Sequence, residues 1–119
     1  MKIRNVFYIG LLFLISTLGF AQGSFFLDSN GVTVKCTGCV TGDQGVVNGK
    51  TYTAVDDSTI DATADGNWDS IVTTLVTRMS FQPGIVNNQT FNEDISSWDT
   101  SNVTDMSFMF SNATEFNQD

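Results

Sequence analysis

The sequence contains no histidine, only two cysteines, a single proline and five lysine or arginine residues among its 119. The absence of histidine removes the commonest general base and the usual serine and cysteine triads, so catalytic centres of those types are excluded. The scarcity of basic residues argues against nucleic acid and anionic membrane surfaces as partners, because both bind basic patches. The thirteen acidic residues give a net charge of −8 instead.

The N-terminus has the order of features found in secretory signal peptides. Two basic residues precede a mostly apolar run that ends at Ala21, and small residues stand at −3 and −1 of a cut before Gln22. The sequence therefore predicts a signal peptide over residues 1–21 and a secreted or cell-surface protein. Its mature charge is −10, because the cut removes two basic residues and no acidic one. A membrane anchor, the alternative, needs about 20 apolar residues, and no later stretch could span a bilayer.

Residues 22–70 are predicted to form a small β-rich leader. β-Branched residues alternate in 32–36 and again in 51–55, which is typical of strands. The glycine-containing stretch 42–49 between them is typical of turns. A short helix capped by Ser58 is expected to follow.

The Cys36-Thr-Gly-Cys39 pair is the only motif with a chemical interpretation. Thiol redox chemistry needs the first thiolate at a helix N-terminus, but the flanking residues are β-branched and no helical pattern follows. A zinc site needs two further ligands, and the chain has no other cysteine and no histidine. A local disulfide is the favoured interpretation in an exported protein. Free thiols, or a redox or metal role, are the alternatives.

Two groups of acidic residues have both a functional and a structural interpretation. The Asp-Ser-Asn-Gly stretch at 28–31 places oxygen ligands at alternating positions, as calcium prefers, but further loop ligands are missing. Glu93 with Asp99 or Asp105 is the type of carboxylate pair that hydrolyses glycosides. Trp98 could stack a sugar beside them, although a tryptophan in phase with a repeat is more often a core residue. We therefore predict no enzyme, no catalytic residue, no cofactor and no metal site.

Sequence motifs recur at a spacing of about 25 residues. Phe-Asn-Glu-Asp at 91–94 returns as Phe-Asn-Gln-Asp at 116–119. Val-Thr-Arg-Met-Ser-Phe at 76–81 matches Val-Thr-Asp-Met-Ser-Phe at 103–108 in five of six positions. Periods in the twenties are typical of solenoids, whose units stack on their neighbours.

This period divides residues 71–119 into units. We predict a degenerate unit at 71–90, where Pro83 disfavours helix in the residue before it. A full unit follows at 91–115, and the next unit is truncated at residue 119, so the chain is expected to be a fragment.

The full unit has the periodicity of one short strand and one short helix. One stripe of a helix would contain Met106, Met109, Phe110, Ala113 and Phe116, whereas Phe108 lies off it. The Thr-, Ser- and Asn-rich stretch before them suits a turn and strand. The predicted fold is therefore α+β, a β-rich leader followed by the first units of a leucine-rich-repeat-like solenoid. The predicted repeat core consists of Ile95, Trp98, Val103, Met106, Met109, Phe110, Ala113 and Phe116.

The segment Phe-Asn-Glu-Asp-Ile-Ser-Ser-Trp-Asp-Thr-Ser-Asn-Val-Thr-Asp-Met-Ser-Phe-Met-Phe, residues 91–110, resembles the repeat of the BspA-like leucine-rich-repeat surface proteins of bacteria. The resemblance covers about residues 75–119, and residues 30–56 resemble the leader of members from marine Bacteroidetes. It implies a secreted or surface-displayed interaction protein, with adhesion as the suggested role and an unknown protein or glycan as the partner. A carbohydrate-binding module and a purely structural surface or capping element are the alternative functions.

Overall fold

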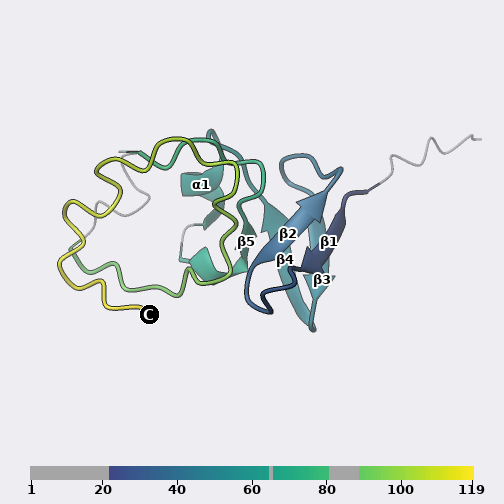
Figure 1. Ribbon diagram of the computed structural model, residues 1–119, viewed down its shortest axis with the longest axis horizontal. Helices are drawn as coiled ribbons and strands as arrows, with labels where there is room; N and C mark the ends of the chain where they lie inside the picture. The colour runs from purple at the N-terminus through teal and green to yellow at the C-terminus, as the bar shows by residue number, and fades with distance from the viewer. Residues whose placement is uncertain (1–21, 65, 81–88) are drawn as a thin grey trace, which may run out of the picture.

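The computed structural model describes residues 22–64, 66–80 and 89–119 (Figure 1). The predicted signal peptide and Pro83 of the degenerate unit lie outside these residues. The first half of the described chain is β-rich, and the second half winds beside it as loops and turns (Figure 1).

In the described residues, five short strands form two sheets. One sheet pairs β1 (Ser24–Leu27) with β2 (Val34–Thr37) in antiparallel fashion. The other has the order β3-β4-β5, with β3 (Gln44–Val47) antiparallel to β4 (Lys50–Ala54) and β4 parallel to β5 (Ile71–Val72). The β-rich leader predicted from the alternation of β-branched residues is therefore present.

Strand β3 lies inside the stretch that was expected to form only turns. Asn48 and Gly49 have φ angles of 51° and 81°. Two successive positive φ values are what a two-residue hairpin turn requires. Gly45 sits within the strand because a Cβ there would lie 2.3 Å from the ring of Phe25. Glycine in this strand thus permits close packing between the two sheets and does not mark a turn.

A short helix, α1 (Ile60–Ala64), follows β4, and a 3₁₀ turn, η1 (Trp68–Ser70), precedes β5. The residue that caps α1 is Asp56 and not Ser58, since Asp56 Oδ1 accepts hydrogen bonds from the N–H groups of Ser58 and Thr59 at 2.9 and 3.1 Å. No helix in the described ranges has the length and apolar character needed to cross a membrane.

The prediction of a helix in the repeat unit is wrong. Residues 105–116 form successive turns, with N–H to C=O bonds from Met109 to Met106, Ser111 to Phe108 and Ala113 to Phe110. Each of these bonds spans three residues, whereas an α-helix spans four. Phe108 also has a φ of 58°, which an α-helix does not tolerate. The predicted α+β fold, a leucine-rich-repeat-like solenoid of one strand and one helix per unit, is therefore not seen in residues 71–80 and 89–119.

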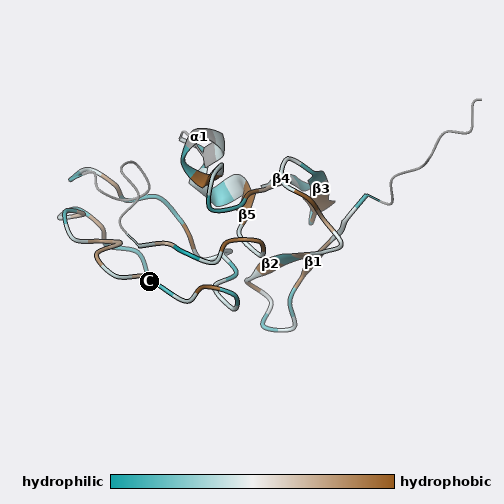
Figure 2. Ribbon diagram, turned by 90° about the horizontal axis from the view of Figure 1, so that it is seen from above, coloured by the Kyte–Doolittle hydropathy of each residue, from teal (hydrophilic) through white to brown (hydrophobic). Residues whose placement is uncertain are grey.

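The two copies of the repeated motif nevertheless lie side by side. We call residues 73–80 and 89–92 the first segment and residues 99–118 the second segment. Arg78 pairs with Asp105 in a parallel bridge, at the offset of 27 that aligns the two copies in the sequence. Figure 2 shows that hydrophobic residues here form short stretches separated by hydrophilic ones, which suits irregular coils that bury single side chains.

One apolar core joins the leader to both segments. It contains Trp68 and Ile71 from the leader side together with Phe91, Trp98 and Met109. Further members are Val55, Ile60, Val76 and Met79. A second cluster, under the leader strands, contains Val34, Cys36, Cys39, Val47, Tyr52, Ala54 and Val72.

The predicted repeat-core residues divide into three groups. Trp98 and Met109 are buried. Met106 and Phe110 differ from the prediction, because 44% and 38% of their surfaces are exposed. Without a helix, residues three and four apart no longer share one face. The remaining four pack against the core while staying partly exposed, namely Ile95, Val103, Ala113 and Phe116.

Candidate functional site

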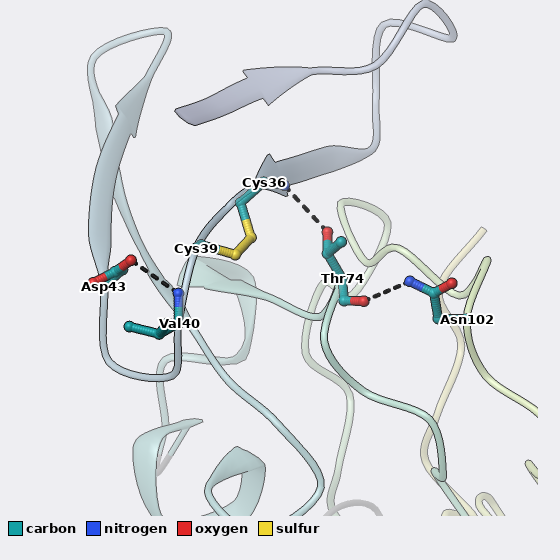
Figure 3. The surroundings of a disulfide bond; sticks show 6 residues. All are labelled: Cys36, Cys39, Val40, Asp43, Thr74 and Asn102. Carbon is teal, nitrogen blue, oxygen red and sulfur yellow. Dashed lines mark hydrogen bonds between the residues drawn. A yellow bond between two sulfur atoms is a disulfide. The ribbon is translucent and has the colours of Figure 1, made fainter. Parts of the chain in front are cut away.

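Cys36 and Cys39 form a disulfide that closes a turn at the end of β2 (Figure 3). Both residues are buried within the second apolar cluster. The backbone at Gly23 passes directly over them, since a Cβ added there would meet the Cα of Cys39 at 2.3 Å. A pair that is bonded, buried and covered in this way has the character of a structural disulfide and not of a reactive thiol.

Hydrogen bonds lead from this disulfide to the second segment (Figure 3). The N–H of Cys36 donates to Thr74 Oγ1 at 3.2 Å. The carbonyl oxygen of Thr74 in turn accepts from Asn102 Nδ2 at 2.7 Å. Strand β2 also contacts this region directly, because the N–H of Val34 donates to the carbonyl of Ser97 at 2.9 Å. The disulfide hairpin therefore forms one side of the contact between the leader and the repeat region.

Asp57 forms a second contact between the leader and the repeat region. Its Oδ1 accepts from the N–H groups of Thr77 and Arg78 at 2.7 and 3.2 Å, and its Oδ2 accepts from Thr77 Oγ1 at 2.7 Å. Partial burial raises the pKa of Asp57, but the hydrogen bonds from Thr77 and Arg78 outweigh it and hold the pKa below its ordinary value. One side chain thus satisfies two backbone donors on the leader side of the first segment.

Asp99 holds the second segment against the first, and Trp98, which precedes it, bonds to the leader. The Trp98 indole Nε1–H donates to the carbonyl of Trp68 at 2.9 Å, and Thr73 Oγ1 accepts from the N–H of Asp99 at 2.8 Å. Asp99 is 2% exposed, and its Oδ1 accepts from the N–H and hydroxyl of Ser101. Burial raises the pKa of Asp99, yet the hydrogen bonds from Ser101 and Thr74 and the charge of Lys35 together hold the pKa below its ordinary value, so the carboxylate stays ionised at neutral pH.

Of the acidic residues with a proposed chemical role, Asp99 and Asp105 accept hydrogen bonds from nearby serines. Asp105 Oδ1 accepts from the N–H of Ser107 at 2.9 Å, the same arrangement that Asp99 makes with its own neighbour. Glu93 is exposed. Asp28 pairs with Lys35 at 2.9 Å, which places a cation where the calcium hypothesis needs a ligand. Within residues 22–64, 66–80 and 89–119, no group of three metal-ligating side chains is found.

The most exposed apolar feature of the second segment is the apolar turn, residues 106–110. Phe108 is 74% exposed at its tip, with Met106 and Phe110 on either side. The φ of 58° at Phe108 is in the left-handed region, where a bulky side chain is a genuine outlier. Met109, between them, is buried and anchors the turn to the core. No sequence pattern indicated this positive φ, because glycine or asparagine normally occupies such a position.

Residues 52–119 match the model of a protein family described as "Mycoplasma protein of unknown function, DUF285". The matched region is more than half of the chain. The chain belongs to this family. Comparisons with curated proteins and with solved structures find no match.

The family match begins within β4 and therefore includes part of the leader. Asp57, α1 and β5 lie inside it together with both segments, whereas β1, β2 and the disulfide lie outside. The family region thus contains the apolar turn. It also contains Asp57, whose carboxylate binds the first segment. The disulfide hairpin is an addition to one side of that region.

Proposed function

We propose that the protein is a non-catalytic interaction protein that binds other macromolecules at a cell surface or after secretion. The observation that carries this proposal is the apolar turn. Phe108 is exposed and its backbone has an unfavourable φ, so folding gains little from its presence. A large apolar side chain held at the surface by an unfavourable backbone is typical of a site used for contact.

The chemistry of the apolar turn favours a protein partner. Phe108 and its two apolar neighbours can act as aromatic and aliphatic anchors, the residue types that dominate protein interfaces. Stacking of a sugar on Trp98, the basis of the carbohydrate-binding alternative, loses its support because Trp98 is buried and its indole N–H is bonded within the protein. We therefore favour protein contact over glycan contact.

The resemblance to BspA-like surface proteins supports a role in adhesion. The Cys36–Cys39 disulfide supports export, since disulfides persist in oxidising compartments. Expression in a diderm bacterium tests the export proposal. Intact-mass measurement should find a mature protein that begins near Gln22, and an uncleaved product in the inner membrane would count against secretion.

Binding to immobilised extracellular proteins, with a glycan panel in parallel, tests the interaction proposal. We expect saturable binding to a protein surface that falls at least about tenfold in the Phe108→Asp variant, because a desolvated anchor is replaced by a charge. Val46→Asp is the matched control. Val46 is 65% exposed in β3, away from the apolar turn, so its variant should bind like the wild type. Equal losses in both variants, or none in either, would contradict the role of the turn.

A capping function for the leader is the second candidate. A preceding copy of the repeat would provide acceptors for the backbone N–H groups of Thr77 and Arg78. Here the carboxylate of Asp57 accepts from them instead. Repeat proteins need such terminal elements, because an open end exposes unpaired groups. The capping element and the interaction surface are compatible, since Asp57 is not part of the apolar turn.

A further inference from the structure

The leader contains two Asn-Gly pairs, one in each of its hairpin connections. Asn30-Gly31 lies between β1 and β2, and Asn48-Gly49 lies between β3 and β4. An asparagine followed by glycine can rearrange without an enzyme, because glycine has no side chain to keep its backbone nitrogen away from the neighbouring side-chain amide. The reaction requires that this amide can turn and that the glycine N–H is not held in a hydrogen bond.

Asn30-Gly31 meets neither requirement. Asn30 Oδ1 accepts from the N–H groups of Val32 and Thr33, both at 2.9 Å, and its Nδ2 donates to Thr33 Oγ1 at 2.8 Å. The N–H of Gly31 donates to the carbonyl of Asp28 at 2.9 Å. The fold therefore holds both the side-chain amide and the nitrogen that would attack it.

Asn48-Gly49 meets both requirements. The two residues are exposed, and within the part of the chain that the structure describes neither the Asn48 side chain nor the Gly49 N–H makes a hydrogen bond. A Cβ added at Gly49 would meet no atom within 4 Å, so the space beside the turn is open. Strand β3 lies at the end of the molecule opposite the C-terminus (Figures 1 and 2), so the exposure of this turn does not depend on where the repeat stops.

We propose that Asn48-Gly49 is a site of spontaneous deamidation and that the fold protects Asn30-Gly31 from the same reaction. The backbone nitrogen of Gly49 forms a bond to Cγ of Asn48, the bond from Cγ to the side-chain nitrogen breaks, and ammonia leaves. Water then opens the cyclic imide at either of its carbonyls. One opening gives aspartate, and the other gives isoaspartate, whose main chain passes through Cβ. This inference is independent of the proposed interaction at the apolar turn.

The two products have different consequences for the leader. Asp-Gly suits the same two-residue hairpin turn as Asn-Gly, so aspartate at position 48 adds a negative charge and leaves the hairpin intact. Isoaspartate lengthens the main chain between Val47 and Lys50, which pair directly across the turn. Because Val47 is buried in the second apolar cluster, the longer connection disturbs the core of the leader. The isoaspartyl form should therefore be the less stable one.

Incubation of the folded chain in mildly alkaline buffer, followed by trypsin digestion and mass spectrometry, tests the proposal. Cleavage after Lys35 and Lys50 places Asn30 and Asn48 in different peptides. The peptide of residues 36–50 should deamidate at least about tenfold faster than the peptide that ends at Lys35, because the hydrogen bonds around Asn30 must break before it reacts. In urea, the two peptides should deamidate at similar rates, since the fold no longer protects either.

Asn48→Gly is the matched control, because Gly-Gly suits the same turn and has no side-chain amide. In ion-exchange chromatography, this variant should not acquire the acidic form that the wild type acquires during incubation. The proposal is overturned by equal rates for the two peptides in the folded chain, by an unchanged 36–50 peptide, or by an Asn48→Gly variant that becomes acidic as fast as the wild type.

The effect on the hairpin has its own test. The isoaspartyl fraction of the incubated protein should unfold at a lower urea concentration than the Asn48→Asp variant, which carries the same charge on an ordinary backbone. Equal midpoints would contradict the expected effect of the longer main chain.

Discussion

Replacing Asp57 removes the carboxylate that holds the first segment to the leader. In Asp57→Ala, the N–H groups of Thr77 and Arg78 lose their acceptor, and the hydroxyl of Thr77 loses its partner. Loss of a side-chain cap that accepts backbone N–H bonds costs about 0.5–2 kcal/mol. These donors are near solvent and water can replace part of the interaction, so we expect a loss of about 1–2 kcal/mol.

Asp57→Asn separates the charge from the hydrogen bonds. The amide oxygen can still accept from the backbone N–H groups, so this variant should lose less stability than Asp57→Ala at neutral pH. Asp69→Ala is the control for removal of a charge, because Asp69 makes an exposed ion pair with Lys50. Exposed ion pairs contribute about 0–1 kcal/mol, so this control should melt close to the wild type.

The pH dependence provides an independent check on Asp57. Its folded-state pKa is lowered, so the unfolded chain binds the proton more tightly than the native protein. The stability that its carboxylate contributes is then fully present above the unfolded pKa of about 3.9, and it is lost as pH falls through the folded pKa. Urea melts at several pH values should show the gap between wild type and Asp57→Asn closing below about pH 4. A gap that is constant with pH, or an Asp57→Ala variant as stable as the wild type, would refute the capping account.

Three further predictions concern the packing of the leader and the junction. Gly45→Ala should cost about 1–3 kcal/mol, because its Cβ would overlap the ring of Phe25, and the additional change Phe25→Ala should remove the clash without restoring full stability. Trp98→Phe should cost at least about 2 kcal/mol in urea melts, because a buried carbonyl loses its donor and the core loses volume. The Cys36→Ala/Cys39→Ala variant should still fold and lose only about 2 kcal/mol, since the bridge closes a short loop; a failure to fold would show that the disulfide is essential.

The features of the leader that could be predicted from sequence are local ones. Alternation of β-branched residues indicated β2 and β4, and the expected export of the protein favoured the bridge between Cys36 and Cys39 that the structure contains. Strand β3 was missed because Gly45 reads as a turn residue, although its role is to make room for an aromatic ring from another strand. That ring is 20 positions away in the sequence, and no local pattern contains it.

The prediction of a helix in the repeat was wrong for a physical reason. A spacing of three and four residues between apolar side chains also suits consecutive turns that each span three residues, as from Met106 to Met109 and from Phe110 to Ala113. Side chains of serine, threonine, aspartate and asparagine bind nearby backbone groups and compete with helix, as Asp105 does with Ser107. Periodicity alone cannot distinguish the two structures.

The residues of the candidate site had little local signal. The bond between Asp57 and Thr77 joins positions 20 apart, and Asp57 belongs to no recognisable motif. The positive φ of Phe108 contradicts the usual preference of phenylalanine, so sequence reasoning placed it simply off the helical stripe. The alignment of residues 76–81 with 103–108, by contrast, gave the offset at which Arg78 and Asp105 pair, because alignment of two copies is independent of their secondary structure.

The central claim is that two copies of the motif stack in parallel through backbone hydrogen bonds, without a helix in either described segment. Scalar couplings across hydrogen bonds, measured by NMR on the uniformly labelled protein, test it most directly. The account predicts couplings from the Thr104 amide to the Thr77 carbonyl and from the Met79 amide to the Asp105 carbonyl. Helical chemical shifts over residues 105–116, with couplings between residues four apart and none between the two segments, would contradict it.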